Sequence, residues 1–136
     1  MSKNKISEEM RRKRYLEKSE LAEKRISEIE EWIEGDDEKT KLACYKAFQE
    51  IVEVLFDLVA MKIKDSDKNV EDDYKNTERL IDMKIIDKKN AEILNEANGL
   101  RNRIVHKYNN LDDALAKESI IELMPNLKKI LNALIQ

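Results

Sequence analysis

The sequence predicts an all-α domain, an up-and-down bundle of four long helices plus one short helix. Three observations support this fold class. Apolar residues recur at helical spacing in long segments that are separated by short polar ones. The 136 residues include only 2 Gly and 1 Pro, too few for the turns of an all-β fold. Hydrophobic residues make up 41% of the chain, enough for a core, and the length fits a single domain over residues 1–136.

The first helix is expected from about Ile6 to Glu34. Its apolar stripe follows i, i+4, i+7 and i+11 and consists of Ala22, Ile26, Ile29 and Ile33. Gly35 follows as a stop at the C′ position. The start of this helix carries the basic run Arg11–Arg14, which is read as a solvated face, with RNA contact as the alternative.

The second helix is expected to begin at Asp36–Glu38, because acidic residues favour the positive end of a helix dipole. Apolar residues are dense from Leu42 to Ile63, and such a wide arc marks a central helix packed on more than one side. Glu53 and Asp57 share one face of it at i and i+4. Their spacing favours a solvated or bundle-lining pair.

The short helix and the fourth helix follow a polar segment. Residues 64–73 are expected to form a loop, and Asn76 or Thr77 to cap a helix from about Glu78 to Met83. Asp87 is the expected N-cap of the fourth helix, which runs from Lys88 to about His106 or Tyr108.

The last helix is expected from about Asp113 to Ile135, after a turn at 109–112. Ser119 and Glu122 form a capping-box pattern inside it, and Pro125 follows. We therefore expect this segment to kink, or to divide into two pieces near Ser119.

Composition excludes several classes of protein. No apolar run approaches the roughly 18 residues of a transmembrane helix, and the first residues lack the apolar core of a signal peptide, so the expected location is cytoplasmic, with no membrane contact. A single cysteine, Cys44, and a single histidine, His106, exclude a disulfide framework and a Cys/His zinc site within one protomer. We expect neither a metal nor a cofactor. The formal net charge of −3 argues mildly against nonspecific RNA binding.

Residues 98–108 (NGLRNRIVHKY) carry the most chemical information. Arg101, Arg103 and Lys107 occur there without an intervening acid, which creates a local positive potential suited to a phosphate. Histidine is the side chain suited to proton transfer at neutral pH, so the imidazole of His106 could give or take a proton there. On spacing alone, however, a histidine at a helix end is more often a cap or a packed surface residue, and basic residues there complement the dipole.

Helical geometry predicts how these side chains diverge. Asn102 and His106 lie about 40° apart on an ideal helix, so the amide can orient the imidazole ring. Arg101 and His106 lie about 140° apart and do not share a face. A site that uses both is better built where two copies of the helix meet across a dimer axis.

The segment Arg101-Asn102-(three residues)-His106-Lys107-Tyr108 matches the R-x4-H-x-Y motif and resembles the HepT-like branch of the HEPN superfamily. The resemblance extends over nearly all of the chain from about Ile6, including the apolar second helix and the polar loop that leads to Asp73-Tyr74. One departure is Lys107, where the family often has glycine.

The resemblance implies a homodimeric, metal-independent endoribonuclease toxin of a type II or type VII toxin–antitoxin pair. Arg101 would hold the scissile RNA phosphate and His106 would transfer protons. Asn102 and Asp57 would support them, and Arg103 and Lys107 would contact RNA. The antitoxin would be a nucleotidyltransferase of the MNT type that attaches AMP to Tyr108. The alternatives are a non-catalytic module that binds nucleotide or RNA or acts as a scaffold for such a nucleotidyltransferase, and a generic helical partner protein.

Overall fold

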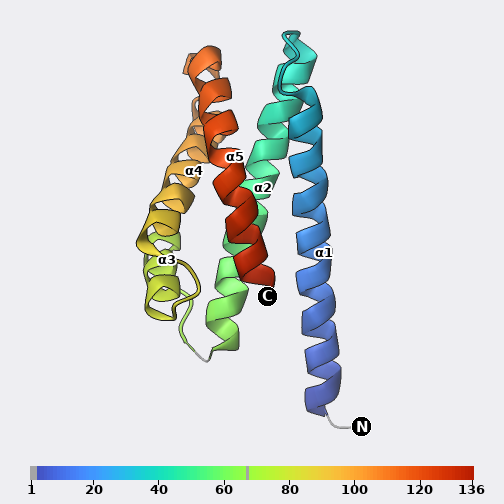
Figure 1. The fold of residues 1–136 in the computed structure, drawn as a ribbon, viewed down its shortest axis with the longest axis vertical. Helices are drawn as coiled ribbons and strands as arrows, with labels where there is room; N and C mark the ends of the chain where they lie inside the picture. The colour runs from blue at the N-terminus through green and yellow to red at the C-terminus, as the bar shows by residue number, and fades with distance from the viewer. Residues whose placement is uncertain (1–2, 67) are drawn as a thin grey trace.

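A computed structural model describes residues 3–66 and 68–136 (Figure 1). Its elements, in chain order, are α1 (Lys3–Trp32), α2 (Glu38–Asp65), α3 (Asp73–Asp82), α4 (Lys88–His106), a 3₁₀ turn (Tyr108–Asn110) and α5 (Asp113–Ile135). The four long helices and one short helix confirm the predicted all-α bundle. Consecutive long helices run in opposite directions, and α3 lies beside the start of α4 (Figure 1).

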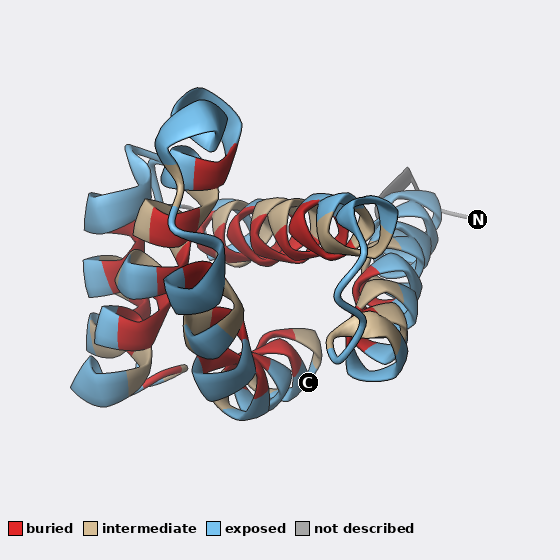
Figure 2. Ribbon diagram, turned by 90° about the horizontal axis from the view of Figure 1, so that it is seen from above, coloured by how far each residue is buried: buried red, intermediate tan, exposed pale blue. Residues whose placement is uncertain are grey.

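Helix α2 is the centre of the bundle, as its wide apolar arc predicted. It packs against α1, α3, α4 and α5. Twelve of its residues are buried, among them Phe48, Ile51, Leu55 and Leu58, which are almost fully removed from solvent. Figure 2 shows buried positions along α2, whereas the outer faces of the surrounding helices are exposed. The hydrophobic effect of burying these side chains fixes the arrangement of the helices that carry the site.

Helix α1 buries only part of its length. Its stripe residues Ala22, Ile26 and Ile29 are buried, but the turns before Tyr15 are exposed and extend to one end of the bundle (Figure 1). The helix ends at Trp32, two residues earlier than predicted. Gly35 does not adopt a left-handed conformation, so it is not the predicted C′ stop. Its role is steric, because a Cβ there would lie 2.7 Å from Cγ2 of Thr40.

The start of α3 differs from the prediction. Asp72 is the N-cap, and its carboxylate accepts a hydrogen bond from the backbone N–H of Lys75. Asn76 and Thr77 lie inside the helix and are buried. The Asn76 side chain pairs with the backbone N–H and carbonyl of Glu71, and so fastens the preceding segment instead of capping the helix.

A Schellman motif ends α3. The N–H of Ile85 donates to the carbonyl of Leu80, and the N–H of Lys84 donates to the carbonyl of Ile81. Lys84 occupies the left-handed C′ position, with φ 61°. Ile85 and Ile86 form a bend, and Asp87, in extended backbone, caps α4 through the N–H of Asn90, as predicted.

Helix α5 is continuous from Asp113 to Ile135, so the predicted division near Ser119 is wrong. Pro125 removes the hydrogen bond that would reach the carbonyl of Ile121. Both residues are exposed, so water can donate a hydrogen bond to the freed carbonyl and the helix continues. Asp112 is the N-cap and accepts from the N–H of Leu115.

No helix within the described ranges combines the length and the apolar character needed to span a membrane.

Candidate active site

A groove of about 590 Å³, here called the Arg101 groove, lies next to the predicted motif. Residues from four parts of the fold line it: Lys18 and Leu21 of α1, Glu53 and Asp57 of α2, Asp73 of α3, and Asn98 and Arg101 of α4. The groove is rich in carboxylates, since Glu50 and Glu71 also line it. It therefore places one motif arginine among several acidic side chains.

Arg101 is tightly held at the groove. Its Nη2 donates to Oε2 of Glu53 at 2.8 Å, and its Nη1 donates to Oδ1 of Asn102 at 2.9 Å. Its Nε is buried and has no hydrogen-bond partner among the described residues. The guanidinium is thus oriented from α2 and from its own helix, while its buried Nε–H has no partner in the part of the chain that the structure describes.

Asp57 lies in the same groove but pairs with Lys18, with 2.9 Å between the side-chain N and O atoms. The carboxylate that contacts Arg101 is Glu53, one helical turn earlier on α2. Sequence reasoning grouped Glu53 and Asp57 on one face and assigned support of the site to Asp57. No feature of the sequence indicated that Glu53 is the one aligned with α4.

Asp73 brings a further carboxyl group to the groove from the first turn of α3. Burial raises the pKa of Asp73, and the nearby Arg101 acts in the opposite direction. Its charge is therefore coupled to that of Arg101, a relation that sequence reasoning did not anticipate.

His106 is separated from this groove. It is the last residue of α4 and is exposed, and it does not line the hollow that contains Arg101. Asn102 uses its amide oxygen for Arg101, so its role in orienting His106 stays a prediction. Arg103 and Lys107 are also exposed, as residues that contact RNA must be.

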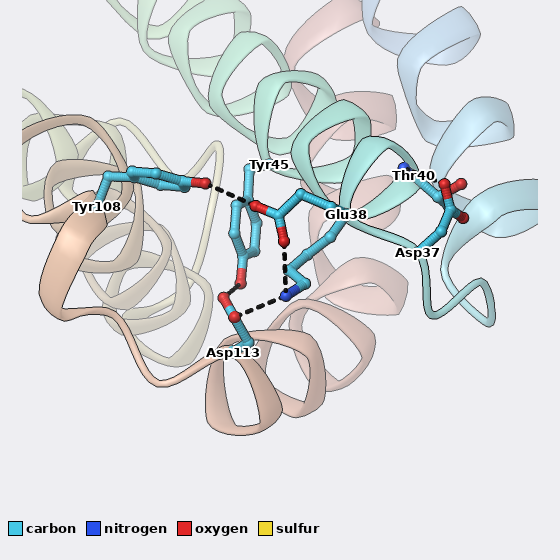
Figure 3. Close-up of polar contacts among 7 residues, drawn as sticks. Asp37, Glu38, Thr40, Tyr45, Tyr108 and Asp113 are labelled. Atoms are coloured by element: carbon cyan, nitrogen blue, oxygen red, sulfur yellow. Dashed lines mark hydrogen bonds and ion pairs between the residues drawn. The ribbon is translucent and has the colours of Figure 1, made fainter.

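Tyr108 connects the end of α4 to the start of α2 (Figure 3). Its hydroxyl donates to Oε1 of Glu38 at 3.1 Å, and its ring packs edge-on against Tyr45, with 6.5 Å between ring centroids. Tyr45 donates to Asp113, which also accepts from Nζ of Lys41 at 2.8 Å. This Tyr108 cluster joins α2, the turn after α4, and α5.

The cluster shifts the proton affinities of its members. Burial and the hydrogen bond to Glu38 raise the pKa of Tyr108, so its hydroxyl is protonated at neutral pH. Burial and Asp113 raise the pKa of Tyr45. Lys41 and Tyr45 lower the pKa of Asp113, which is therefore a carboxylate over the physiological range.

No group of three or more His, Cys, Asp or Glu side chains in the described part of the chain is arranged to hold a metal ion.

Comparison with known proteins identifies the family and agrees with the fold. A family profile described as "Ribonuclease HepT-like" matches residues 12–134, which include every element from most of α1 to nearly the end of α5. The chain belongs to the HepT-like family. Arg101, His106 and Tyr108 all lie within the matched residues.

Relatives and solved structures extend this comparison. A protein of Archaeoglobus fulgidus named "Putative RNase" is 41% identical over 114 residues, 84% of this chain and 86% of that protein. A HEPN toxin of Shewanella oneidensis, solved tri-AMPylated and in complex with its MNT antitoxin, superposes with a TM-score of 0.79 at 16% identity, covering 88% of this chain and 94% of that one. A toxin–antitoxin structure with AMP-PNP gives a TM-score of 0.80 at 15% identity, covering 88% and 96%. At such low identity, the solved structures establish the fold of the HepT-like chain.

Proposed function

We propose that this HepT-like chain is a metal-independent endoribonuclease toxin that cleaves RNA at a composite site formed by Arg101 and His106 in a homodimer. The observation that carries the proposal is the fixed guanidinium of Arg101, whose two Nη atoms are held by Glu53 and Asn102 beside the groove. Membership of the HepT-like family and the 41% identical relative named as an RNase support the reaction class.

The chemistry needs two functions that these side chains supply. A base removes the proton of the RNA 2′-hydroxyl and an acid protonates the departing 5′-oxygen, and one His106 can do both, because the proton that its imidazole accepts is the one that it then donates. Arg101 stabilises the negative charge that grows on the phosphorus oxygens. Because Arg101 and His106 occupy different surfaces of one protomer, the proposed site takes them from facing copies of α4.

The test is cleavage of single-stranded RNA by purified protein in the presence of EDTA. We expect products with a 2′,3′-cyclic phosphate or a 3′-phosphate. His106→Ala should lower the rate by roughly 10²–10⁴-fold, and Arg101→Ala by a comparable factor. Equal rates for the wild type and His106→Ala would overturn the proposal, because the activity would then come from a contaminant or from another site.

The proposed partner is an MNT-type nucleotidyltransferase that transfers AMP to the hydroxyl of Tyr108. The Shewanella toxin, of the same fold, was solved tri-AMPylated with such an antitoxin. Tyr108 is 41% exposed and reachable, although its hydroxyl donates to Glu38. The attached phosphate would remove this donor and would compete with RNA for Arg103 and Lys107.

Co-expression with an MNT-type nucleotidyltransferase, followed by intact-mass measurement, tests this control. We expect additions in steps of one AMP that are absent from Tyr108→Phe. A chain that stays unmodified while its activity is inhibited would show that the partner acts by occlusion alone.

One observation favours the alternative, a non-catalytic scaffold for the nucleotidyltransferase. The Arg101 groove holds more carboxylates than cations, which disfavours entry of a polyanion. The EDTA assay separates the two proposals, since the scaffold predicts antitoxin binding without RNA cleavage.

A further inference from the structure

The cationic charge of the molecule is concentrated at one end. The first 18 residues hold seven Lys and Arg and three Glu, a net charge of +4, so the remaining residues carry −7 of the total of −3. The end of α2 adds Lys62 and Lys64 to the same region, because Lys62 lies over the ring of Tyr15 in α1. The chain is therefore negative in net charge but carries a basic region at one end.

A second hollow, of about 420 Å³, lies within this basic end and is here called the Arg14 hollow. Its lining includes Met10, Arg11, Arg14, Met61, Lys64 and Asp65. Asp65 is already engaged, since it accepts from the hydroxyl of Tyr15 at 2.8 Å and lies 3.6 Å from Nε of Arg11. Arg14 and Lys64 are exposed and form no ion pair with any described residue. Two uncompensated cations thus converge on one concavity from two helices.

The Arg14 hollow adjoins the Arg101 groove. On α2, Asp57 and Ala60 line the groove, and Met61 and Lys64 line the hollow, all at the i, i+3, i+4 and i+7 spacing of one helix face. Lys18 and Arg14 repeat this order on α1. Eleven residues of α2 separate Glu53, the partner of Arg101, from Lys64, so the two sites are about 16 Å apart along the axis, or roughly five nucleotides stacked at ~3.4 Å each.

From this arrangement we infer that the Arg14 hollow is a second RNA subsite, in which Arg14 and Lys64 bind backbone phosphates of the strand about five nucleotides from the scissile bond. The inference rests on the proposed ribonuclease function and adds a binding site to it. Met10 and Met61 give the hollow an apolar wall beside the cations, which suits a nucleotide with its base and its phosphate. The subsite also explains how a chain with an acidic groove and a negative net charge can hold RNA.

An anionic membrane is the competing partner for a basic helix end, and the structure favours RNA. A membrane-bound helix presents a continuous apolar face. Here the exposed Ile6 and Met10 share a face at i and i+4, but Arg14 and Glu17, which continue that face, are charged, and cations line a concave hollow. Membrane binding would also not explain why the Arg14 hollow lies next to the Arg101 groove.

The experiment uses the full chain and 2′-O-methyl oligonucleotides, which bind without being cut because they lack the reacting hydroxyl. Fluorescence anisotropy measures the binding of a dodecanucleotide and of a tetranucleotide. Three proteins are compared: the wild type, the double variant Arg14→Gln, Lys64→Gln, and a control double variant of the same net charge, Lys24→Gln, Lys129→Gln. Lys24 and Lys129 are exposed and lie outside both hollows.

We expect the Arg14/Lys64 variant to bind the dodecanucleotide about 25-fold more weakly near 0.1 M salt. The slope of log K against log salt should fall by about 1.4, or about 0.7 for each lost phosphate contact. Tetranucleotide binding and the control variant should be nearly unchanged. Equal weakening by the control, an unchanged slope, or an effect confined to vesicles of anionic lipid would overturn the subsite.

Cleavage measured in parallel separates this inference from the proposed function. RNA cleavage that is insensitive to Arg14 and Lys64 at any substrate length would overturn the subsite and leave the ribonuclease intact. Length-dependent binding without cleavage by the wild type would overturn the ribonuclease and leave the subsite as an RNA-binding surface.

Discussion

Arg101 donates hydrogen bonds to an amide and to a carboxylate, and the carboxylate determines the orientation of its guanidinium. Asn102 comes from the same helix and moves with it, whereas Glu53 comes from the centre of the bundle. The charge-assisted hydrogen bond to Glu53 restricts the orientation of the planar guanidinium more strongly than an arginine side chain without such a partner would be restricted. Glu53 is therefore a positioning residue in the proposed site.

Glu53→Ala should lower RNA cleavage by about 10–100-fold, mainly through kcat, because a misplaced guanidinium no longer meets the developing charge. Stability should change by less than about 1 kcal/mol, since both side chains are partly exposed. Glu53→Gln, which keeps an acceptor oxygen, should recover part of the rate. Asp57→Asn is the control, and an equal loss there would contradict a specific role for Glu53.

Asp113 gives a pH-dependent contribution to stability. Lys41 and Tyr45 depress its pKa, so the stabilisation is complete above the unfolded-state value of ~3.9 and is lost as the pH falls through the lower folded-state value. Asp113→Asn should therefore lower the urea midpoint at neutral pH by about a few tenths molar and have little effect near pH 2. A difference that persists undiminished at low pH would indicate lost packing instead of lost charge.

At the scale of the elements, the sequence predicted the helices well and the details of their ends less well. Apolar residues at helical spacing indicated the long helices, because each of them buries an apolar face in the core. The start of α3 was misplaced because Asp72 and Asn76 are both good N-caps, and local propensity does not distinguish them. The contact of Glu53 with Arg101 was not predicted for a related reason, and the supporting role of Asp57 stays a prediction. Both lie on one face of α2, and only the packing of α4 decides which of them meets Arg101.

The end of α3 allows a direct test of backbone strain. Lys84 occupies a left-handed conformation that costs a residue with a side chain about 1 kcal/mol or more. Lys84→Gly should raise the free energy of unfolding by about 0.5–1 kcal/mol, as measured by urea denaturation. Lys84→Ala keeps the strain and should give no gain. If alanine stabilises as much as glycine, the lysine side chain itself is the unfavourable element.

At the scale of the whole molecule, the proposed site takes Arg101 and His106 from two copies of the chain. We expect a C2 homodimer, seen by light scattering as a mass of about twice 16.0 kDa. Mixing inactive Arg101→Ala and His106→Ala chains provides the stricter test. Random exchange makes about half of the dimers mixed, each with one intact site, so about a quarter of the wild-type activity should return. A persistent monomer, or no recovery after confirmed exchange, would contradict the composite site.

The distribution of charge along α1 also affects how the protein behaves on a column. Its sequence pI of about 5.4 suggests that at neutral pH it binds only to anion exchangers. An ion-exchange resin, however, contacts one surface of a protein, so retention depends on the charge of that surface and not on the net charge of the molecule. With Arg14 and Lys64 unpaired at one end, we expect retention on heparin or sulfonate media at low salt, and earlier elution of the Arg14→Gln, Lys64→Gln variant than of the wild type. Each molecule therefore carries a permanent electrical polarity, and would meet any charged surface end-on.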